Sequence, residues 1–232
     1  RSTLIEDGIE HPFPDEPYDV PFKARADVVL VGKARAPGGR AVASLVVRLA
    51  VRDIDKCIDV VGDRRIGRDG SVAEPAPFAE MPLAWERAAG GPGTSNPEGV
   101  SIDATDSWGE SVVPNMFAQG ATFHGRRDFI APVGFGPMAP AGTGTEPNNI
   151  APIDQRLDGA LRGDEHLVLE YVHPEHERWV TNMPGARPVA FAFVAGQDPR
   201  PVPLLCDTMW IDAERGEVAL TWRSLLDAAA LG

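Results

Sequence analysis

Hydrophobic positions along the chain favour β-strands over helices. In residues 41–51, large apolar side chains fall at every second position, namely Leu45, Val47, Leu49 and Val51. A period of two places these side chains on one face of a strand and the intervening residues on the other face. Short apolar runs, rich in β-branched residues, predict further strands at residues 27–32, 56–61, 166–172 and 189–194.

Turn residues indicate how the first strands connect. Residues 36–40 read Ala-Pro-Gly-Gly-Arg, a composition typical of a tight turn, which predicts a hairpin between strands 27–32 and 41–51. The next turn leads into strand 56–61. We therefore expect these three strands to form an antiparallel meander.

The end of the chain has a second hairpin pattern. Strands are predicted at residues 204–211 and 217–222, with a turn at 212–216. Only residues 224–231 have helical spacing, with Ser224 as a candidate N-cap. The sequence thus predicts little helix.

The middle of the chain differs in kind from both ends. From residue 74 to residue 152, Pro, Gly, Asn and Ser recur so often that no window keeps a period. We predict a mainly β, antiparallel, sandwich-like single domain over residues 27–223, with a long loop-rich Pro/Gly central region. We expect residues 1–26, with clustered prolines, to form an extended lead-in that is the remnant of a longer N-terminal part. Residues 224–232 form a short helix or tail.

Composition and charge limit the classes of partner. The chain has 24 Gly and 22 Pro in 232 residues, and 43% of its residues are hydrophobic, enough to build a core. With 22 Lys and Arg against 34 Asp and Glu, the net charge is −12, which argues against nucleic acid or an anionic membrane as partners. No apolar run approaches the roughly 18 residues of a membrane span. We expect a cytoplasmic protein.

Two cysteines and one histidine pair are candidates for chemistry. Cys57 and Cys206 lie in apolar strand-like runs, so we expect both to be buried and reduced. His173 and His176 flank a carboxylate, but a proline separates them and no second ligand cluster is evident. We therefore expect a turn, with no metal and no cofactor.

Carboxylates provide the remaining enzyme candidates. Asp103 and Asp106 lie near Trp108, an arrangement that would suit sugar hydrolysis but equally suits a solvated loop. Asp207, in an otherwise apolar strand, requires a partner, and Arg223 is the natural candidate for a structural ion pair. Familiar nucleophile and phosphate-binding motifs are missing from the sequence. We predict no catalytic residues.

The central loops carry the most distinctive residues. Trp85 and Arg87 form the kind of pair that anchors protein interfaces, and the glycines beside Phe135 allow close approach of the backbone. We therefore take Trp85, Arg87, Asn96 and Phe135 as candidate protein-binding residues. The alternative is that these loops pack on the sheet as part of the core.

A series of short sequence motifs in a fixed order resembles the pattern of a known bacterial family, domain of unknown function 2169. In this sequence the motifs are Pro82-Leu83-x-Trp85-x-Arg87, Gly90-Gly91-Pro92, Asn96-Pro97-x-Gly99, Pro114-Asn115, Pro132-x-Gly134-Phe135-Gly136-Pro137, Ala151-Pro152-x-Asp154-Gln155, Gly163-Asp164-Glu165, Met183-Pro184-Gly185, Cys206-Asp207-Thr208-x-Trp210-Ile211-Asp212 and Trp222-Arg223. The resemblance runs from about Asp27 to Arg223. Because so many unrelated motifs occur in one order, the resemblance is specific.

The resemblance implies a function. The family is similar in context to type VI secretion adaptors, which join a toxin effector to the VgrG spike or its PAAR tip. It thus implies a cytoplasmic adaptor or chaperone whose partners are an effector and the VgrG/PAAR spike proteins, with no catalytic residues to carry over. The alternatives are a hydrolase that uses Asp103, Asp106 or the His173 and His176 pair, and a permanent structural subunit of a secretion assembly.

The sequence departs from the family pattern in two places. Family members have further strands ahead of the position of Arg1, and a longer segment where this chain has residues 138–150. We therefore expect residues to be missing near Gly142 to Glu146.

Overall fold

The computed structural model describes residues 23, 25–67, 69–93, 96–101, 105, 111–119, 134–138 and 148–224. Within these residues the chain is mainly β, with three short 3₁₀ turns and several mostly antiparallel sheets. The predicted fold class is confirmed. The lead-in up to residue 22 and the predicted helix beyond Ser224 lie outside the described residues.

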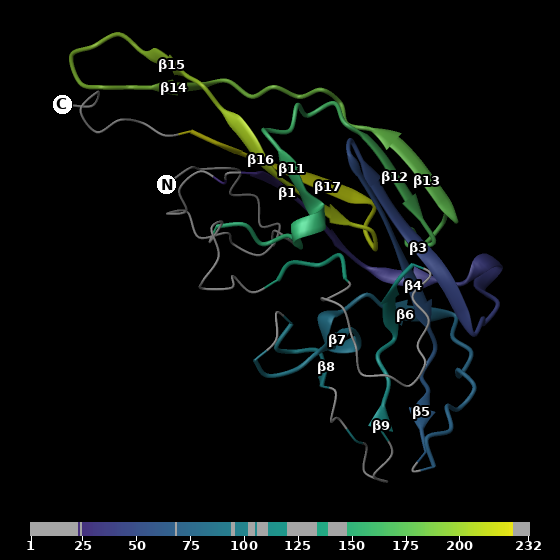
Figure 1. Ribbon diagram of the computed structural model, residues 1–232. Coiled ribbons are helices and arrows are strands. Elements are labelled where there is room, and N and C mark those ends of the chain that lie inside the picture. Colours follow the sequence, from purple (N-terminus) through teal and green to yellow (C-terminus); the bar gives the residue numbers. More distant parts are fainter. Residues whose placement is uncertain are drawn as a thin grey trace, which may run out of the picture.

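The first large sheet has four strands in the order β11-β1-β16-β17 (Figure 1). These are β11 (Arg156–Asp158), β1 (Arg25–Val31), β16 (Leu205–Asp212) and β17 (Glu217–Arg223). The predicted C-terminal hairpin is confirmed as β16 and β17. Strand β1 runs parallel to β16 and antiparallel to β11, so the sheet is mixed.

The second large sheet has five antiparallel strands in the order β10-β4-β3-β12-β13. These are β10 (Met116–Ala118), β4 (Ile54–Val61), β3 (Ser44–Val51), β12 (His166–Glu170) and β13 (Arg178–Asn182). In β3, every second residue from Val47 to Val51 is buried, which confirms the face assignment made from the alternating pattern.

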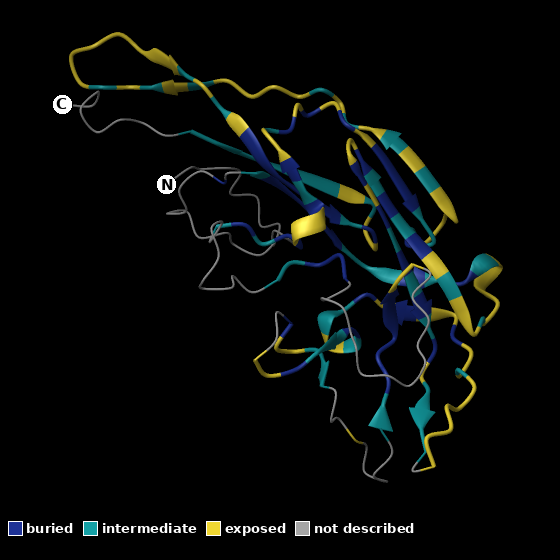
Figure 2. Ribbon diagram, viewed as in Figure 1, coloured by how far each residue is buried: buried dark blue, intermediate teal, exposed yellow. Residues whose placement is uncertain are grey.

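One core joins the two sheets in a sandwich-like arrangement. Its buried side chains come from both sheets, among them Val28, Leu30, Met209 and Ile211 from the first and Val47, Leu49, Ile58, Leu167 and Leu169 from the second. Figure 2 shows the buried parts of these strands in dark blue. Full burial of each such side chain contributes about 1.5–3 kcal/mol. A smaller cluster of Val29, Ala151 and Trp210 covers the other face of the first sheet.

The predicted hairpin between strands 27–32 and 41–51 is wrong. Strand β1 pairs with β11 and β16, whereas β3 lies in the other sheet. The physical reason is that the central residues of β1 are buried toward both faces, which suits a central strand between two partners. The chain continues past Gly32 into β2 (Lys33–Arg35), and the turn η1 (Pro37–Gly39) then leads to β3.

The central region forms short two-stranded pieces rather than uniform loop. The pairs are β2 with β6 (Glu80–Pro82), β5 (Arg65–Ile66) with β9 (Ser111–Val112), and β7 (Ala89–Gly90) with β8 (Val100–Ser101). The 3₁₀ turn η2 (Trp85–Arg87) lies between β6 and β7, and η3 (Ile153–Gln155) comes directly before β11. These pieces are too short to leave a periodic signal in the sequence.

A two-stranded arm projects from the first sheet. It consists of β14 (Ala190–Ala192) and β15 (Arg200–Val202), which pair only with each other among the described strands. Strand β14 confirms the strand predicted at residues 189–194. In Figure 1 the arm extends far from the end that carries β5, β7, β8 and β9.

Candidate functional site

Trp85 ties two distant loops together. Its indole Nε1 donates hydrogen bonds to the carbonyl oxygens of Pro137, at 2.9 Å, and Gly136, at 3.3 Å. The six-membered ring lies so close to Gly134 that a Cβ there would come within 2.7 Å of it. The glycines beside Phe135 therefore allow the close approach that the sequence predicted, and the group that approaches is Trp85.

Phe135 is a core residue. Its side chain is 0% exposed and belongs to the main core cluster. Its backbone carbonyl accepts hydrogen bonds from the Leu30 amide, at 3.1 Å, and from the side-chain amide of Gln155, at 3.0 Å. Phe135 thus anchors its loop to β1 and offers no ring surface to a partner in this conformation.

A buried lysine holds the same loop from the other side. The ammonium group of Lys56, on β4, donates to the Gly134 carbonyl at 2.6 Å, to Gln155 Oε1 at 2.8 Å and to Asp154 Oδ1 at 2.9 Å. Burial lowers the pKa of Lys56, and the Asp154 carboxylate opposes this shift. The three acceptors satisfy all three N–H groups of the ammonium.

Asn96 closes the loop that follows Trp85. It is buried, and its side-chain amide donates to the carbonyl oxygens of Trp85, at 2.9 Å, and Ala89, at 3.1 Å. Its own carbonyl accepts hydrogen bonds from the amides of Gly91 and Gly99. A Cβ at Gly99 would come within 2.2 Å of the Asn96 side chain, so this glycine is required by packing.

Arg87 joins the loops to the end of β4. Its guanidinium donates to Asn115 Oδ1 at 3.0 Å and to Asp63 Oδ1 at 3.1 Å. The Asn115 amide in turn donates to the Arg87 carbonyl at 2.7 Å. The Arg87 side chain keeps 36% of its surface exposed.

All four candidate residues thus hold the central loops in place. We call residues 80–93, 96–101 and 134–138 the loop platform. Asn96 and Phe135 are buried within it, Trp85 is half-buried, and Arg87 is partly exposed. The surface that the loop platform presents comes instead from exposed residues of the same segments, among them Glu86, Pro92, Pro97 and Glu98. The sequence contained no signal for this division, because burial of loop residues leaves no periodic pattern.

The His173 and His176 pair lies in the turn between β12 and β13. The two rings stack with centroids 4.9 Å apart, and His173 also contacts Trp179. His173 Nδ1 accepts a hydrogen bond from the Glu175 amide at 3.1 Å, and burial lowers the pKa of His173. The described residues contain no cluster of His, Cys, Asp and Glu suited to a metal ion. Asp103 and Asp106 lie outside the described residues.

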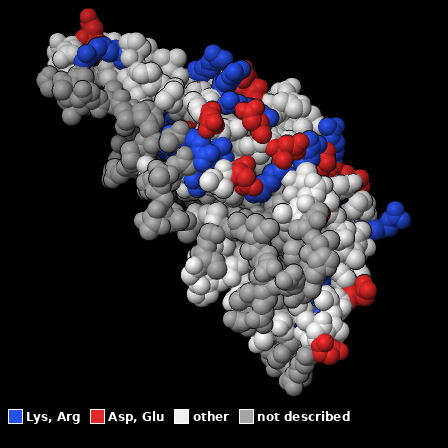
Figure 3. Space-filling model, viewed as in Figure 1, with Lys and Arg blue, Asp and Glu red and all other residues white. Residues whose placement is uncertain are grey.

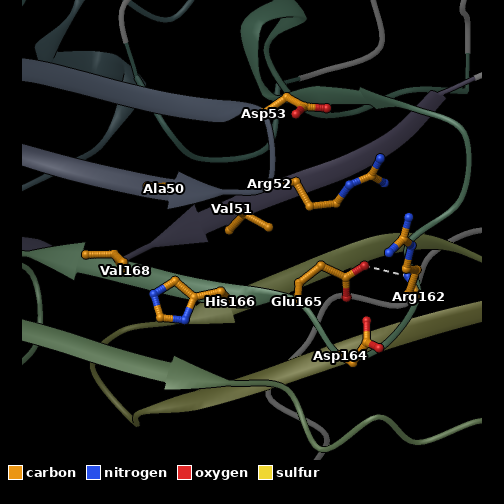
Figure 4. Close-up of a pocket in the computed structure, with 9 residues that line it drawn as sticks. All are labelled: Ala50, Val51, Arg52, Asp53, Arg162, Asp164, Glu165, His166 and Val168. Carbon is orange, nitrogen blue, oxygen red and sulfur yellow. Dashed lines mark hydrogen bonds between the residues drawn. The ribbon is translucent and has the colours of Figure 1, made fainter.

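A polar pocket of about 520 Å³ opens beside the start of β12 (Figure 4). It is lined by both acids and bases, including Arg52, Asp53, Arg162, Asp164 and His166. Glu165 is buried at its base, where its carboxylate accepts hydrogen bonds from two backbone amides of the preceding turn. The Gly-Asp-Glu motif therefore forms a turn. The mixed charges that line the pocket favour no single ligand.

A buried ionic network crosses the first sheet. Arg223 Nη1 lies 2.5 Å from Asp207 Oδ2, which confirms the predicted ion pair. The network continues through Thr208 to Lys23, whose ammonium lies 2.9 Å from Asp27 Oδ2. Sequence reasoning missed Lys23 and Asp27. Each of the two buried carboxylates in the network has a basic partner, which is consistent with a structural role.

The two cysteines have different surroundings. Both are free, as predicted. Cys206 is fully buried, and burial raises the pKa of its thiol to about 12. Cys57 is only half-buried, so the prediction of full burial is wrong for this residue, which faces the outer side of β4.

The described residues contain no helix long and apolar enough to cross a membrane.

Comparison with known proteins gives a family for the chain. A family model described as an uncharacterized protein conserved in bacteria (DUF2169) matches in two segments, residues 10–144 and 140–223. No curated protein and no solved structure matches at the threshold applied. The matched segments include every residue of the loop platform and both large sheets. The chain therefore belongs to the bacterial DUF2169 family.

Proposed function

We propose that this chain is a non-enzymatic adaptor that binds a toxin effector in the bacterial cytoplasm and helps to load it onto the VgrG/PAAR spike of a type VI secretion system. The proposal combines the resemblance of the sequence to such adaptors with the construction of the loop platform. It assigns no catalytic group, metal or cofactor.

The observation that carries the proposal is the way in which the loop platform is held. Buried polar side chains of Lys56, Asn96 and Gln155 bind backbone carbonyl groups of the loops. Burial of each polar group requires its desolvation, which only a well-formed hydrogen bond offsets. Loops held in this way are ordered before a partner arrives, which lowers the entropic cost of binding.

The exposed residues of the loop platform indicate the chemistry of the partner. Glu86 and Glu98 present carboxylates beside two exposed prolines, in a chain of net charge −12. A partner face that carries Lys or Arg is therefore favoured, because unlike charges speed encounter and suppress wrong partners. The stacked His173 and His176 rings lie in a turn and do not favour the hydrolase alternative.

The test is capture of the partner from the native bacterial host. The tagged chain is expressed at its native level, and the proteins bound to it are identified by mass spectrometry. The matched control is the same chain with Glu98→Arg. We expect a toxin effector or a spike protein to be enriched on the parent and depleted on the variant. Enrichment of neither class would overturn the proposal.

A further inference from the structure

The arm formed by β14 and β15 carries an apolar stripe on one face. Phe191 on β14 and the flanking Val189 and Phe193 occupy alternate positions and are 52%, 72% and 79% exposed. Pro201, directly opposite Phe191 on β15, is also exposed. In Figure 3 the surface of the arm is largely white, apart from acidic and basic side chains at its tip. Residues 188–197 contain no charged residue.

The two edges of the arm differ in their hydrogen-bonding groups. Because Pro201 has no N–H, the Phe191–Pro201 pair cannot be a mutually hydrogen-bonded pair. The ladder bonds therefore lie at the neighbouring pairs, and the N–H and C=O of Phe191 point away from β15. By the same alternation, Val189 and Phe193 also present their backbone groups at this outer edge.

The outer edge of β15 is blocked. Prolines occupy positions 199, 201 and 203, at each of which an N–H would otherwise point outward. Proline is a common means of protecting an edge strand from pairing. The outer edge of β14 has neither a proline nor a charge between Val189 and Phe193, and among the described residues no strand pairs with it. Within the part of the chain that the structure describes, the arm is thus protected on one edge and open on the other.

From these observations we infer that the outer edge of β14 binds an extended segment of a partner protein by strand addition. The segment is uncharged over about five residues and has large apolar side chains at alternate positions, which pack beside Phe191 and Phe193. A two-stranded ribbon is marginally stable in water, and a third strand stabilises it. Backbone hydrogen bonds supply the affinity and the alternating side chains supply the specificity.

A second copy of the chain fits this edge less well. Complete burial of Val189, Phe191 and Phe193 removes on the order of 300 Å² per copy, well below the roughly 800 Å² per partner of a stable complex. Each copy also carries a net charge of −12, which opposes association of identical chains. An added strand from a different protein avoids this repulsion, and as a short, reversibly bound segment it does not need the area of a stable dimer.

The inference goes beyond the proposed function, because the arm lies apart from the loop platform (Figure 1) and its test involves no secretion protein. The probe is a fluorescein-labelled synthetic peptide, Gln-Thr-Val-Thr-Phe-Thr-Phe-Thr-Gln. The control peptide has Pro in place of its first Phe. Binding to the complete chain is measured by fluorescence anisotropy, and the protected amides are located by hydrogen exchange.

Two variants at one position separate edge pairing from contact with the apolar face. Phe191→Pro removes the outward N–H, whereas Phe191→Val keeps this donor and a strand-forming side chain. We expect the first to weaken peptide binding at least tenfold and the second by no more than about threefold. The amides of Phe191 and Phe193 should gain protection in the parent, and the melting temperature should stay unchanged in both variants, since Phe191 lies outside the core.

Three outcomes would overturn the inference. The first is equal binding of the two peptides, or no binding of either. The second is an equal loss in Phe191→Val and Phe191→Pro, which would place the contact on the apolar face. The third is a parent chain that sediments as a dimer and becomes monomeric in Phe191→Pro, which would make a second copy the occupant.

Discussion

The indole Nε1 of Trp85 donates a hydrogen bond of 2.9 Å to the backbone carbonyl of Pro137, 52 residues further along the chain. This contact joins two loops that carry different motifs of the family. Phe135, two residues before Pro137 in the second loop, is buried in the core. Trp85 therefore determines how one loop lies on the other, and its main role is to shape the loop platform.

Removal of this hydrogen bond should cost stability without removing the aromatic packing. Trp85→Phe keeps a ring against Gly134 but loses the donor to Gly136 and Pro137. We expect a loss of about 1 kcal/mol in the free energy of unfolding, measured by urea denaturation. Trp85→Ala should cost about 3 kcal/mol, because the ring is lost as well. A Trp85→Phe variant as stable as the parent would show that the hydrogen bond does not hold the loops.

Lys56 should be far more important for stability than an exposed lysine. Lys56→Met leaves the Gly134 carbonyl and the Gln155 side chain without their donor, and we expect a loss of about 2–3 kcal/mol. The matched control is Lys33→Met, which breaks an exposed ion pair with Glu80 and should change stability by less than about 0.5 kcal/mol. Equal losses in the two variants, measured by urea denaturation, would contradict the role assigned to Lys56.

Cys206 should make stability depend on pH in the alkaline range. Its folded pKa of about 12 lies above the ordinary thiol value near 8.5. The unfolded chain therefore ionises first as pH rises, so the stabilising contribution is complete below about pH 8.5 and is lost progressively toward pH 12. We expect Cys206→Ala to remove a slope of up to about 1.4 kcal/mol per pH unit in this range. Identical pH profiles for parent and variant would contradict this assignment.

The same environments predict different thiol reactivity. In the native protein at pH 8, Cys57 should be alkylated before Cys206, because only Cys57 is partly exposed. Burial raises the pKa of Cys57 as well, so its labelling should still be slower than that of a free thiol. Mass spectrometry of timed samples gives both rates. Labelling of Cys206 at the rate of Cys57 would mean that the first sheet opens readily.

The sequence predicted those parts of the fold that depend on local pattern. Alternation identified the buried face of β3, and the turn at residues 212–216 identified the C-terminal hairpin. The pairing of β1 was not predictable in this way, because its partner β16 lies some 180 residues away. A turn signal near Pro37 is real but leads from β2 to β3. Sheet membership is a tertiary property that turn chemistry does not encode.

The candidate residues illustrate a similar limit. Sequence reasoning singled out Trp85, Arg87, Asn96 and Phe135 as distinctive, and the structure brings all four into one connected region. Sequence reasoning could not separate the buried residues that shape a surface from the exposed residues that form it. That distinction depends on burial, and burial of irregular segments follows from long-range contacts such as those of Lys56 and Gln155.

The proposed function requires the loop platform to bind the effector through its exposed residues. The most direct measurement is the affinity of the captured effector for three forms of the chain: the parent, Glu98→Arg and Glu175→Arg. Both variants make the same change of charge at an exposed residue, but Glu175 lies in the turn between β12 and β13. Melting temperatures establish that all three forms are folded.

If the loop platform is the binding surface, Glu98→Arg weakens binding at least tenfold, about 1.4 kcal/mol, with an unchanged melting temperature, while Glu175→Arg binds as the parent does. Equal affinity of all three forms, or a larger loss in Glu175→Arg than in Glu98→Arg, would contradict it.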